Sequence, residues 1–391
     1  SNGLAAELQP AQWAAVKLPV KEAITVGAWV KLTELAPDLT RLRLYVGAPH
    51  HNVGQPAEFV VRVERALVGG GPSFWPGGPD GRALERGWID EATWLEQMER
   101  LGNYLRDAAL WVIEHERFDL LIFYQPQADE TGHQFLLRHP RQTGYNDPAQ
   151  RARFAENLAR GWRSVDANLK ALVRAAGSQT NFVLVADHGM IPVHTRVFPN
   201  RFLQERGFVV RAAKESAGGK PIQVRAITSG AEAHIYINLA GRQPGGVVAA
   251  REFPKLVKRL VSLFAGLRDP ATQEPVFEVV TDREGTREYR LLHEQTTGDV
   301  WLSLKPGYIF SMNDEPGEVF ETSRPEGQHG YLARFREMQT IFVAAGPRIQ
   351  KATLGVVNNV DVAPTVAALL GVEPPRDAQG RVLEEILIKK E

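Results

Sequence analysis

The sequence predicts an α/β protein, an αβα sandwich with a mixed, largely parallel sheet and an inserted, smaller antiparallel α+β subdomain. Two observations support this. Between residues 118 and 187, short apolar runs typical of buried strands alternate with a long amphipathic helix, which is the pattern of a parallel sheet covered by helices. Between residues 191 and 312, short strand-like pieces alternate with Gly and Pro turns, which favours antiparallel strands.

Two long helices are predicted from apolar side chains that recur every three or four residues. They span Ile89–Glu116 and Pro148–Ala176. A shorter helix is expected at Ala249–Phe264, and a closing helix at Val362–Leu370.

Three apolar runs are predicted as central strands that are buried on both faces. They are Phe118–Tyr124, Phe182–Ala186 and Thr340–Ala345. Arg41–Val46 and Glu58–Glu64 alternate apolar and polar residues, which predicts strands with one exposed face. Gly69–Gly81 is rich in Gly and Pro and predicts a loop.

The predicted division places a core in residues 1–190 and 313–391 and a cap-like subdomain in residues 191–312. The strands expected in the subdomain are Phe208–Arg211, Ala233–Leu239, Glu278–Thr281 and Val300–Leu304.

Composition excludes several classes of function. The 391 residues carry 46 basic and 46 acidic side chains, so the formal net charge is zero and gives no electrostatic case for a nucleic-acid or membrane partner. There is no cysteine, which excludes disulfides, thiolate metal ligands and a cysteine nucleophile. Neither a membrane-spanning run nor a signal-peptide pattern is present. The bacterial cytoplasm and the periplasm both fit a soluble protein of this composition.

Acidic residues and histidines follow two of the predicted strands. Asp187 and His188 come directly after Phe182–Ala186, and Asp129 and His133 lie just past the strand before. Neighbours on a strand point to opposite faces, so Asp187 and His188 can share a site only where the strand has ended, and Gly189 provides the conformational freedom for a turn.

A third segment, His329-Gly330, lies downstream. Carboxylate and imidazole groups are ligands for divalent metals, and the carboxyl ends of strands are where open α/β sheets bind ligands. A strand-end cap beside a structural histidine explains the Asp187–His188 pair alone equally well. Three such segments in this order are a more specific signal for a metal site.

These segments resemble those of the alkaline phosphatase superfamily, and within it the type I phosphodiesterase/nucleotide pyrophosphatase family. Asp187-His-Gly-Met190 and Asp129-Glu-Thr-Gly-His133 are similar to two of the family's motifs. Asp299–Tyr308 resembles the family's strand before Gly-Tyr, and Asn359–Gly371 its closing helix. The resemblance covers roughly residues 90 to 380.

The resemblance implies two divalent ions, usually zinc, about 4 Å apart. By the family pattern, Asp129, His133 and His329 hold one ion, and Asp187 and His188 hold the other. It further implies a Thr or Ser nucleophile that attacks phosphorus in a small-molecule phosphate ester or nucleotide.

The family's early segment, a strand ending in Asp and followed by the nucleophile, is not recognisable in this sequence. Thr25, Thr33, Thr40 and Ser73 lack its context, so the catalytic nucleophile is unassigned. We expect this chain to be the carboxyl-terminal part of a longer enzyme, because Ser1-Asn2-Gly3 resembles a cloning remnant. A natural non-catalytic relative is the alternative.

Two other functions remain open. Phosphonoacetate hydrolases share the Asp-His-Gly-Met motif, and their substrate-binding residues cannot be located by sequence. A metal-stabilised binding module without turnover is the hypothesis from a different class. The sequence does not indicate the oligomeric state.

Overall fold

The computed structural model describes residues 7–21, 24–50, 53–67, 77–210 and 221–388. The chain divides into two compact units, which are described separately. The first unit comprises residues 1–131, 156–185 and 341–391, and the second comprises residues 132–155 and 186–340. The core and subdomain boundaries predicted from the sequence stay a prediction. Among the described helices, none combines the length and the apolar character that crossing a membrane requires.

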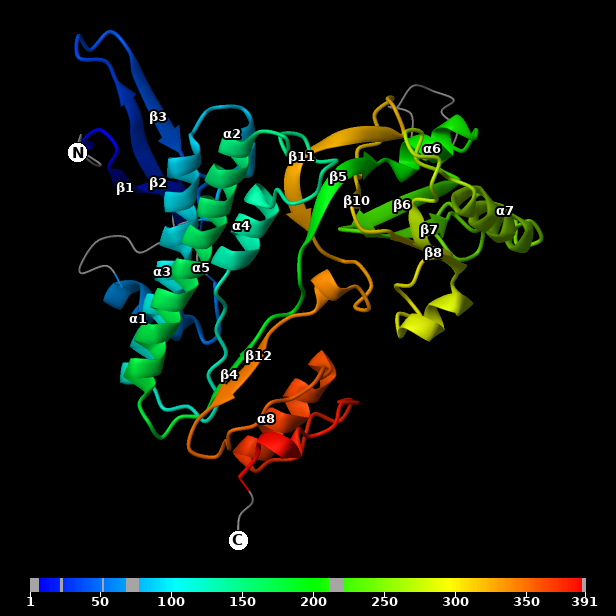
Figure 1. Ribbon diagram of the computed structural model, residues 1–391. Coiled ribbons are helices and arrows are strands. Elements are labelled where there is room, and N and C mark those ends of the chain that lie inside the picture. Colours follow the sequence, from blue (N-terminus) through cyan, green and yellow to red (C-terminus); the bar gives the residue numbers. More distant parts are fainter. Residues whose placement is uncertain (1–6, 22–23, 51–52, 68–76, 211–220, 389–391) are drawn as a thin grey trace. The chain divides into compact units, whose positions relative to one another are not determined.

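The fold class is α/β, as predicted, with one mixed sheet and three antiparallel sheets among the described strands (Figure 1). The first unit contains β1 (Trp13–Lys21), β2 (Ile24–Leu35), β3 (Leu42–Val46), α1 (Ala57–Leu67), α2 (Gly81–Glu85), α3 (Glu91–His115), β4 (Phe182–Val185), β12 (Phe342–Ala345) and α8 (Val362–Leu370). Two helices have residues in both units, α4 (Gln127–Phe135) and α5 (Pro148–Ala176).

Helices α3 and α5 lie side by side in the first unit (Figure 1). Asp90 caps the start of α3 by accepting a hydrogen bond from Thr93 N at 2.8 Å. The Arg160 guanidinium of α5 binds both carboxylate oxygens of Glu99 on α3 at 2.5 and 2.7 Å. Trp94 of α3 is almost completely buried, as the helical periodicity predicted. Both long helices were therefore predicted correctly.

The three predicted central strands require a correction. β4 and β12 pair with each other in an antiparallel two-stranded sheet, and neither is a central strand of a parallel sheet. Phe118–Tyr124 forms no strand at all, and its Ile122 is 82% exposed. An apolar run becomes a buried strand only beside another strand, and the described residues provide no neighbour for this one.

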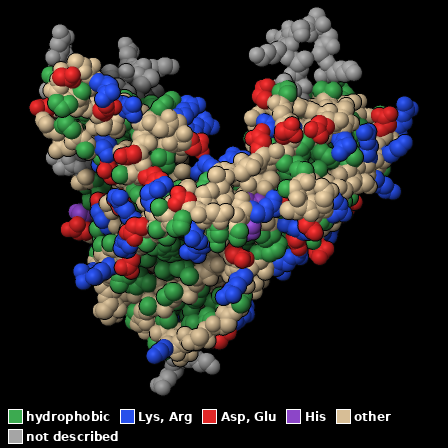
Figure 2. Space-filling view, turned by 45° about the horizontal axis from the view of Figure 1, so that its top comes forward, with side chains coloured by type: hydrophobic (Ala, Val, Ile, Leu, Met, Phe, Trp, Pro, Cys, Tyr) green, Lys and Arg blue, Asp and Glu red, His purple; other side chains and the backbone are tan. Residues whose placement is uncertain are grey.

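Exposed apolar side chains are concentrated around this incomplete sheet. Figure 2 shows a broad hydrophobic area in the lower part of the molecule, where Figure 1 places β4, β12 and α8. The exposed large hydrophobic residues in or next to these elements, and in the 118–124 run, are Phe118, Leu120, Ile122, Phe123, Tyr124, Val185, Ile341, Val343, Val360 and Leu370. Soluble proteins rarely expose a contiguous apolar area of this kind.

The prediction of a strand at Glu58–Glu64 was also wrong, because this segment belongs to helix α1. Phe59, Val60 and Val63 have helical as well as alternating spacing, so the pattern was ambiguous. The ring of Phe59 packs edge-on against Trp111 of α3 at 6.0 Å between centroids, a contact that favours the helix. Of the predicted loop at 69–81, residues 69–76, with Ser73, lie outside the described part.

The second unit is built on an antiparallel sheet in the order β6-β7-β9-β8. Its strands are β6 (Val224–Ser229), β7 (Glu232–Ile237), β8 (Phe277–Asp282) and β9 (Val300–Leu304), and its helices are α6 (Pro199–Glu205) and α7 (Phe253–Ala265). Ile235, Leu302, Leu260 and Phe264 belong to its core and are completely buried. The predictions for β7, β8, β9 and α7 were correct. Residues 208–210 form no strand, and Arg211 lies outside the described residues.

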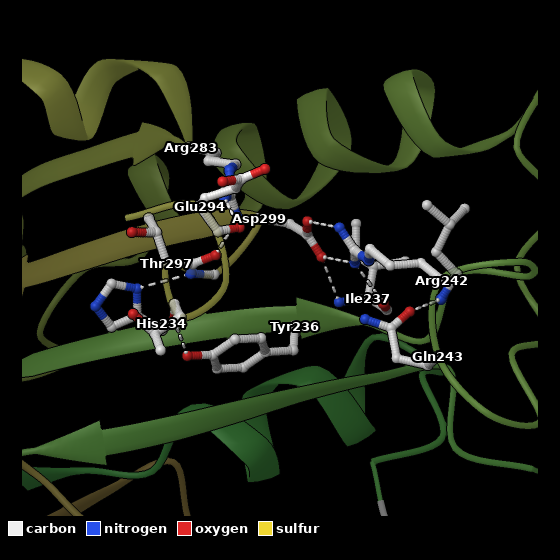
Figure 3. Close-up of polar contacts among 12 residues, drawn as sticks. His234, Tyr236, Ile237, Arg242, Gln243, Arg283, Glu294, Thr297 and Asp299 are labelled. Atoms are coloured by element: carbon white, nitrogen blue, oxygen red, sulfur yellow. Dashed lines mark hydrogen bonds and ion pairs between the residues drawn. The ribbon is translucent and has the colours of Figure 1, made fainter. Parts of the chain in front are cut away.

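Asp299 joins the end of β7 to the start of β9 (Figure 3). Its carboxylate is 2% exposed and binds the Arg242 guanidinium through two contacts of 2.6 and 2.7 Å. It also accepts the backbone N–H of Ile237 at 2.7 Å. Tyr236 and His234 hold the neighbouring loop, because the Tyr236 hydroxyl donates to Thr296 O and His234 Nδ1 accepts Gly298 N.

A mixed sheet in the order β10-β5-β11 completes the second unit. β5 (Ile191–Val197) is parallel to β10 (Tyr308–Phe310) and antiparallel to β11 (Phe320–Gln328). The pairing of β11 is interrupted between Thr322 and Glu326. The buried Glu326 carboxylate accepts hydrogen bonds from Arg196 at 2.8 Å and from Ser323. This irregular stretch leads directly to the segment that ends at His329.

Candidate metal site

The last turn of α4 positions His133. Its Nδ1 lies 2.9 Å from the carbonyl oxygen of Gly327 in β11. A carbonyl oxygen only accepts hydrogen bonds, so Nδ1 carries the proton and donates it, and Nε2 of the neutral ring keeps its lone pair. Histidines that bind metals are commonly oriented by such a bond from the other ring nitrogen.

His188 has the same type of orientation. Its Nδ1 lies 3.0 Å from the carbonyl oxygen of Gly189, which leaves Nε2 as the possible ligand atom. Asp187 precedes it, and its Oδ1 accepts the backbone N–H of His188 at 3.1 Å. The other carboxylate oxygen of Asp187 lies 3.7 Å from Nε2 of His188. The Asp187 side chain is largely exposed.

Close backbone contacts at two glycines support the histidines. Gly189 directly follows His188, and Gly230 packs against the backbone of His329. A Cβ at Gly189 would lie 2.0 Å from the carbonyl oxygen of Glu337, so this position accepts no larger residue. Its φ is not positive, and the role expected for it, conformational freedom at a turn, is replaced by close approach. A Cβ at Gly230 would lie 2.4 Å from the carbonyl oxygen of His329, which also accepts the N–H of Ala231 at 3.2 Å.

Three histidine rings come together in the second unit. The rings of His188 and His329 are stacked, with centroids 3.7 Å apart and an interplanar angle of 17°. The ring of His133 meets that of His329 edge-on at 5.0 Å. The ligand atoms of His188 and His329 lie within 4.8 Å of one another. Side chains separated by almost two hundred residues in the sequence are thus neighbours in space.

Asp129 lies one helical turn before His133 on α4. Residues four apart on a helix share a face, so the helix directs the Asp129 carboxylate and the His133 ring to the same side. The next residue, Glu130, is largely buried. Burial, followed by the negative charge of Asp129, raises the pKa of Glu130 to about 7.

Sequence reasoning named Asp129, His133, Asp187, His188 and His329, and within the second unit the structure brings the last four together. That they bind metal stays a prediction. Sequence reasoning missed Gln142 and the close packing at Gly327, both of which hold α4 against β11. A Cβ at Gly327 would lie 2.7 Å from the carbonyl oxygen of Gly132 in α4. The sequence carries no signal for Gln142, because its role depends on contacts between segments that are distant in the chain.

Comparison with known protein families identifies the chain. The model of the type I phosphodiesterase/nucleotide pyrophosphatase family matches residues 46–332, well over half of the sequence. The chain belongs to this family. The resemblance inferred from the Asp-His-Gly-Met and Asp-Glu-Thr-Gly-His segments is confirmed. A comparison with curated protein sequences finds no match.

Solved structures similar to this family member include human ectonucleotide pyrophosphatase/phosphodiesterase 5, at 15% identity and a TM-score of 0.46. The match covers 76% of this chain and 64% of the human one. An inactive murine variant in complex with AMP matches at 16% identity and a TM-score of 0.44, covering 74% and 62%. Phosphonoacetate hydrolase from Sinorhizobium meliloti 1021, in complex with phosphonoformate, matches at 18% identity and a TM-score of 0.35. This match covers 65% of this chain and 53% of the hydrolase. The chain thus spans less than two thirds of these relatives.

Proposed function

We propose that this chain is the metal-binding part of a phosphohydrolase that cleaves phosphodiester or pyrophosphate bonds in small-molecule phosphate esters or nucleotides. The observation that carries the proposal is the convergence of His133, His188 and His329, two of which have Nδ1 bonded to a backbone carbonyl. Membership of the type I phosphodiesterase/nucleotide pyrophosphatase family supports the class of reaction.

The donor set fits zinc. Neutral imidazoles and carboxylates are common zinc ligands, and the sequence offers no thiolate to compete with them. In this proposal Asp129, His133 and His329 hold one ion, and Asp187 and His188 hold a second. Two such ions would stabilise negative charge on the attacking and leaving oxygens of a phosphoryl group.

The protein's own contribution to this site is orientation. The carbonyl oxygens of Gly327 and Gly189 fix which nitrogen of His133 and His188 is protonated, so each ring presents Nε2 without a cost in rotational freedom. The Asp187 carboxylate is largely exposed, so solvent can reach this ligand.

The nucleophile, a Thr or Ser, is proposed to lie outside these 391 residues, since no segment of this chain has the family's nucleophile context. The ion held by Asp187 and His188 has two ligands from this chain, against three for the other. We therefore expect it to bind more weakly. The chain alone should bind about one zinc ion tightly and hydrolyse aryl phosphodiesters negligibly.

The test is zinc stoichiometry and affinity, measured by competition with a chromogenic chelator, together with hydrolysis of bis-p-nitrophenyl phosphate. His329→Ala and His133→Ala should abolish tight binding. His115→Ala removes an exposed histidine on α3 and is the matched control, which should leave zinc affinity unchanged.

The outcomes separate the alternatives. Absence of zinc binding by the unaltered chain would contradict the metal site. Metal-dependent turnover of the diester by this chain would show that it contains the nucleophile after all. Turnover of phosphonoacetate instead would favour the C–P bond hydrolase. If a longer polypeptide that includes the upstream residues also binds zinc without turnover, the protein is a metal-stabilised binding module.

A further inference from the structure

We infer that Gln142 is the positioning residue that sets the distance between His133 and His329. The inference rests on the proposed metal site and adds a residue that binds no metal itself. Gln142 lies in the loop that follows α4, nine residues after His133. The residue is 3% exposed, and its side chain lies between the end of α4 and strand β11.

The Gln142 amide uses all of its hydrogen-bonding capacity for this junction. Its Nε2 donates to Leu136 O, directly after α4, at 2.8 Å and to Glu326 O in β11 at 3.1 Å. Its Oε1 accepts the backbone N–H groups of Arg138 and His139 at 2.8 and 2.9 Å. An amide has two donor hydrogens and two acceptor lone pairs, so all four are satisfied.

Two hydrogen bonds, one from α4 and one from the loop that follows it, reach adjacent residues of β11. Gln142 binds the carbonyl of Glu326, and His133 binds the carbonyl of Gly327. His329 follows two residues later. The helix that carries one histidine is therefore attached to the strand that carries the other immediately before that second histidine.

The Gln142 contact is independent of the histidine itself. Without it, α4 would be held against β11 by the His133–Gly327 hydrogen bond and by the close approach of Gly327 to the carbonyl oxygen of Gly132. A metal ion tolerates deviations of only a few tenths of an ångström in its ligand distances. Loss of the Gln142 hydrogen bonds should therefore weaken metal binding, although every ligand atom is retained.

No other polar side chain of similar size substitutes for the glutamine. A glutamate would place a carboxylate oxygen against the carbonyls of Leu136 and Glu326, where two donor hydrogens are needed. A methionine would keep the volume but leave four backbone groups without these partners. Both changes keep the size of the side chain, so packing is largely preserved.

The experiment compares Gln142→Glu and Gln142→Met with a matched change elsewhere in the second unit. Asn200 is 1% exposed, and its amide likewise joins two backbone groups, donating to Ala226 O at 3.0 Å and accepting Ala226 N at 2.9 Å. Asn200→Asp therefore also replaces a buried amide with a carboxylate, as Gln142→Glu does, at a contact between α6 and β6. Circular dichroism and thermal melting establish that each variant is folded.

Zinc affinity is measured by chelator competition, and ligand geometry by the visible absorption spectrum of the Co²⁺-substituted protein. We expect Gln142→Glu and Gln142→Met to lower zinc affinity by tenfold to a hundredfold and to shift the Co²⁺ bands, since changes behind metal ligands have effects of this size. Asn200→Asp should lower the melting temperature while affinity and spectrum stay unchanged.

Three results would overturn the inference. Both Gln142 variants could retain full affinity and an unaltered spectrum, or Asn200→Asp could reduce affinity to the same degree, which would make the effect a general loss of stability. In either case the unaltered chain still binds zinc, and the proposed function stands. If the unaltered chain binds no zinc, the proposed function itself fails, and the inference fails with it.

Discussion

Replacing Glu232 with glutamine should stabilise the protein relative to the unaltered chain. This gain in stability should be larger at alkaline pH than at acidic pH. Glu232 begins β7 and lies largely out of solvent. Burial raises the pKa of its carboxyl group to about 7, and the nearby indole N–H of Trp301 offsets this only in part. The folded state therefore binds a proton that the unfolded state releases near its ordinary pKa of 4.5.

The direction and size of the effect follow from the two pKa values. Below pH 4.5 the carboxyl group is protonated in both states, and the glutamine variant should resemble the unaltered chain. As the pH rises through 4.5 towards 7 and above, ionisation favours the unfolded state, so the unaltered chain loses stability and the variant does not. The advantage of Glu232→Gln should be about 1 kcal/mol at pH 5 and about 3 kcal/mol at pH 8.

The assay is urea denaturation of both proteins, followed by tryptophan fluorescence, at several values between pH 5 and pH 8. The difference between the two free energies of unfolding removes the contribution of all other titrating groups. Titration of the carboxyl carbon of Glu232 by NMR reports its pKa directly. A difference that stays constant with pH, or a carboxyl group that titrates near 4.5, would refute the reasoning.

Three further results are expected. Asp299→Ala should destabilise the second unit by about 1–3 kcal/mol in urea denaturation, because it removes the hydrogen-bond acceptor of Arg242 and of the buried Ile237 N–H; a loss well under about 1 kcal/mol would show that these contacts add little. Gly327→Ala places a Cβ 2.7 Å from the carbonyl oxygen of Gly132, so it should cost about 1–3 kcal/mol and lower zinc affinity, whereas unaltered affinity would mean that α4 and β11 can separate freely. Ile122→Lys, at a position 82% exposed, should leave the melting temperature unchanged and reduce both binding of the dye ANS and aggregation on heating; a large drop in melting temperature would show that the residue is packed in solution.

Long periodic segments were predictable from the sequence because many residues contribute to each. The helices predicted at 148–176 and 362–370 match α5 and α8 at both ends. Shorter apolar runs carried less information. The run at 118–124 has strand-forming residues but no strand beside it, and that neighbour is a property of the tertiary structure.

The candidate site was predictable to the extent that its residue types are unusual. Aspartate and histidine next to glycine after apolar runs indicated His133, His188 and His329. Gln142 and Gly327 could not be found in this way. One is a common polar residue and the other one of 35 glycines, and each matters only through a contact with a distant segment.

The turn between β6 and β7 limits where residues can be inserted into the protein. Its residue Gly230 has a φ of +57° and packs against the carbonyl oxygen of His329, so the hairpin is also a support for that histidine. An inserted loop or peptide tag there would displace the histidine, even though the hairpin itself could re-form around it. The exposed turn at Gly177, which follows α5 and where a Cβ meets no other atom within 4 Å, supports none of these histidines. Insertions for labelling or immobilisation belong at the second turn.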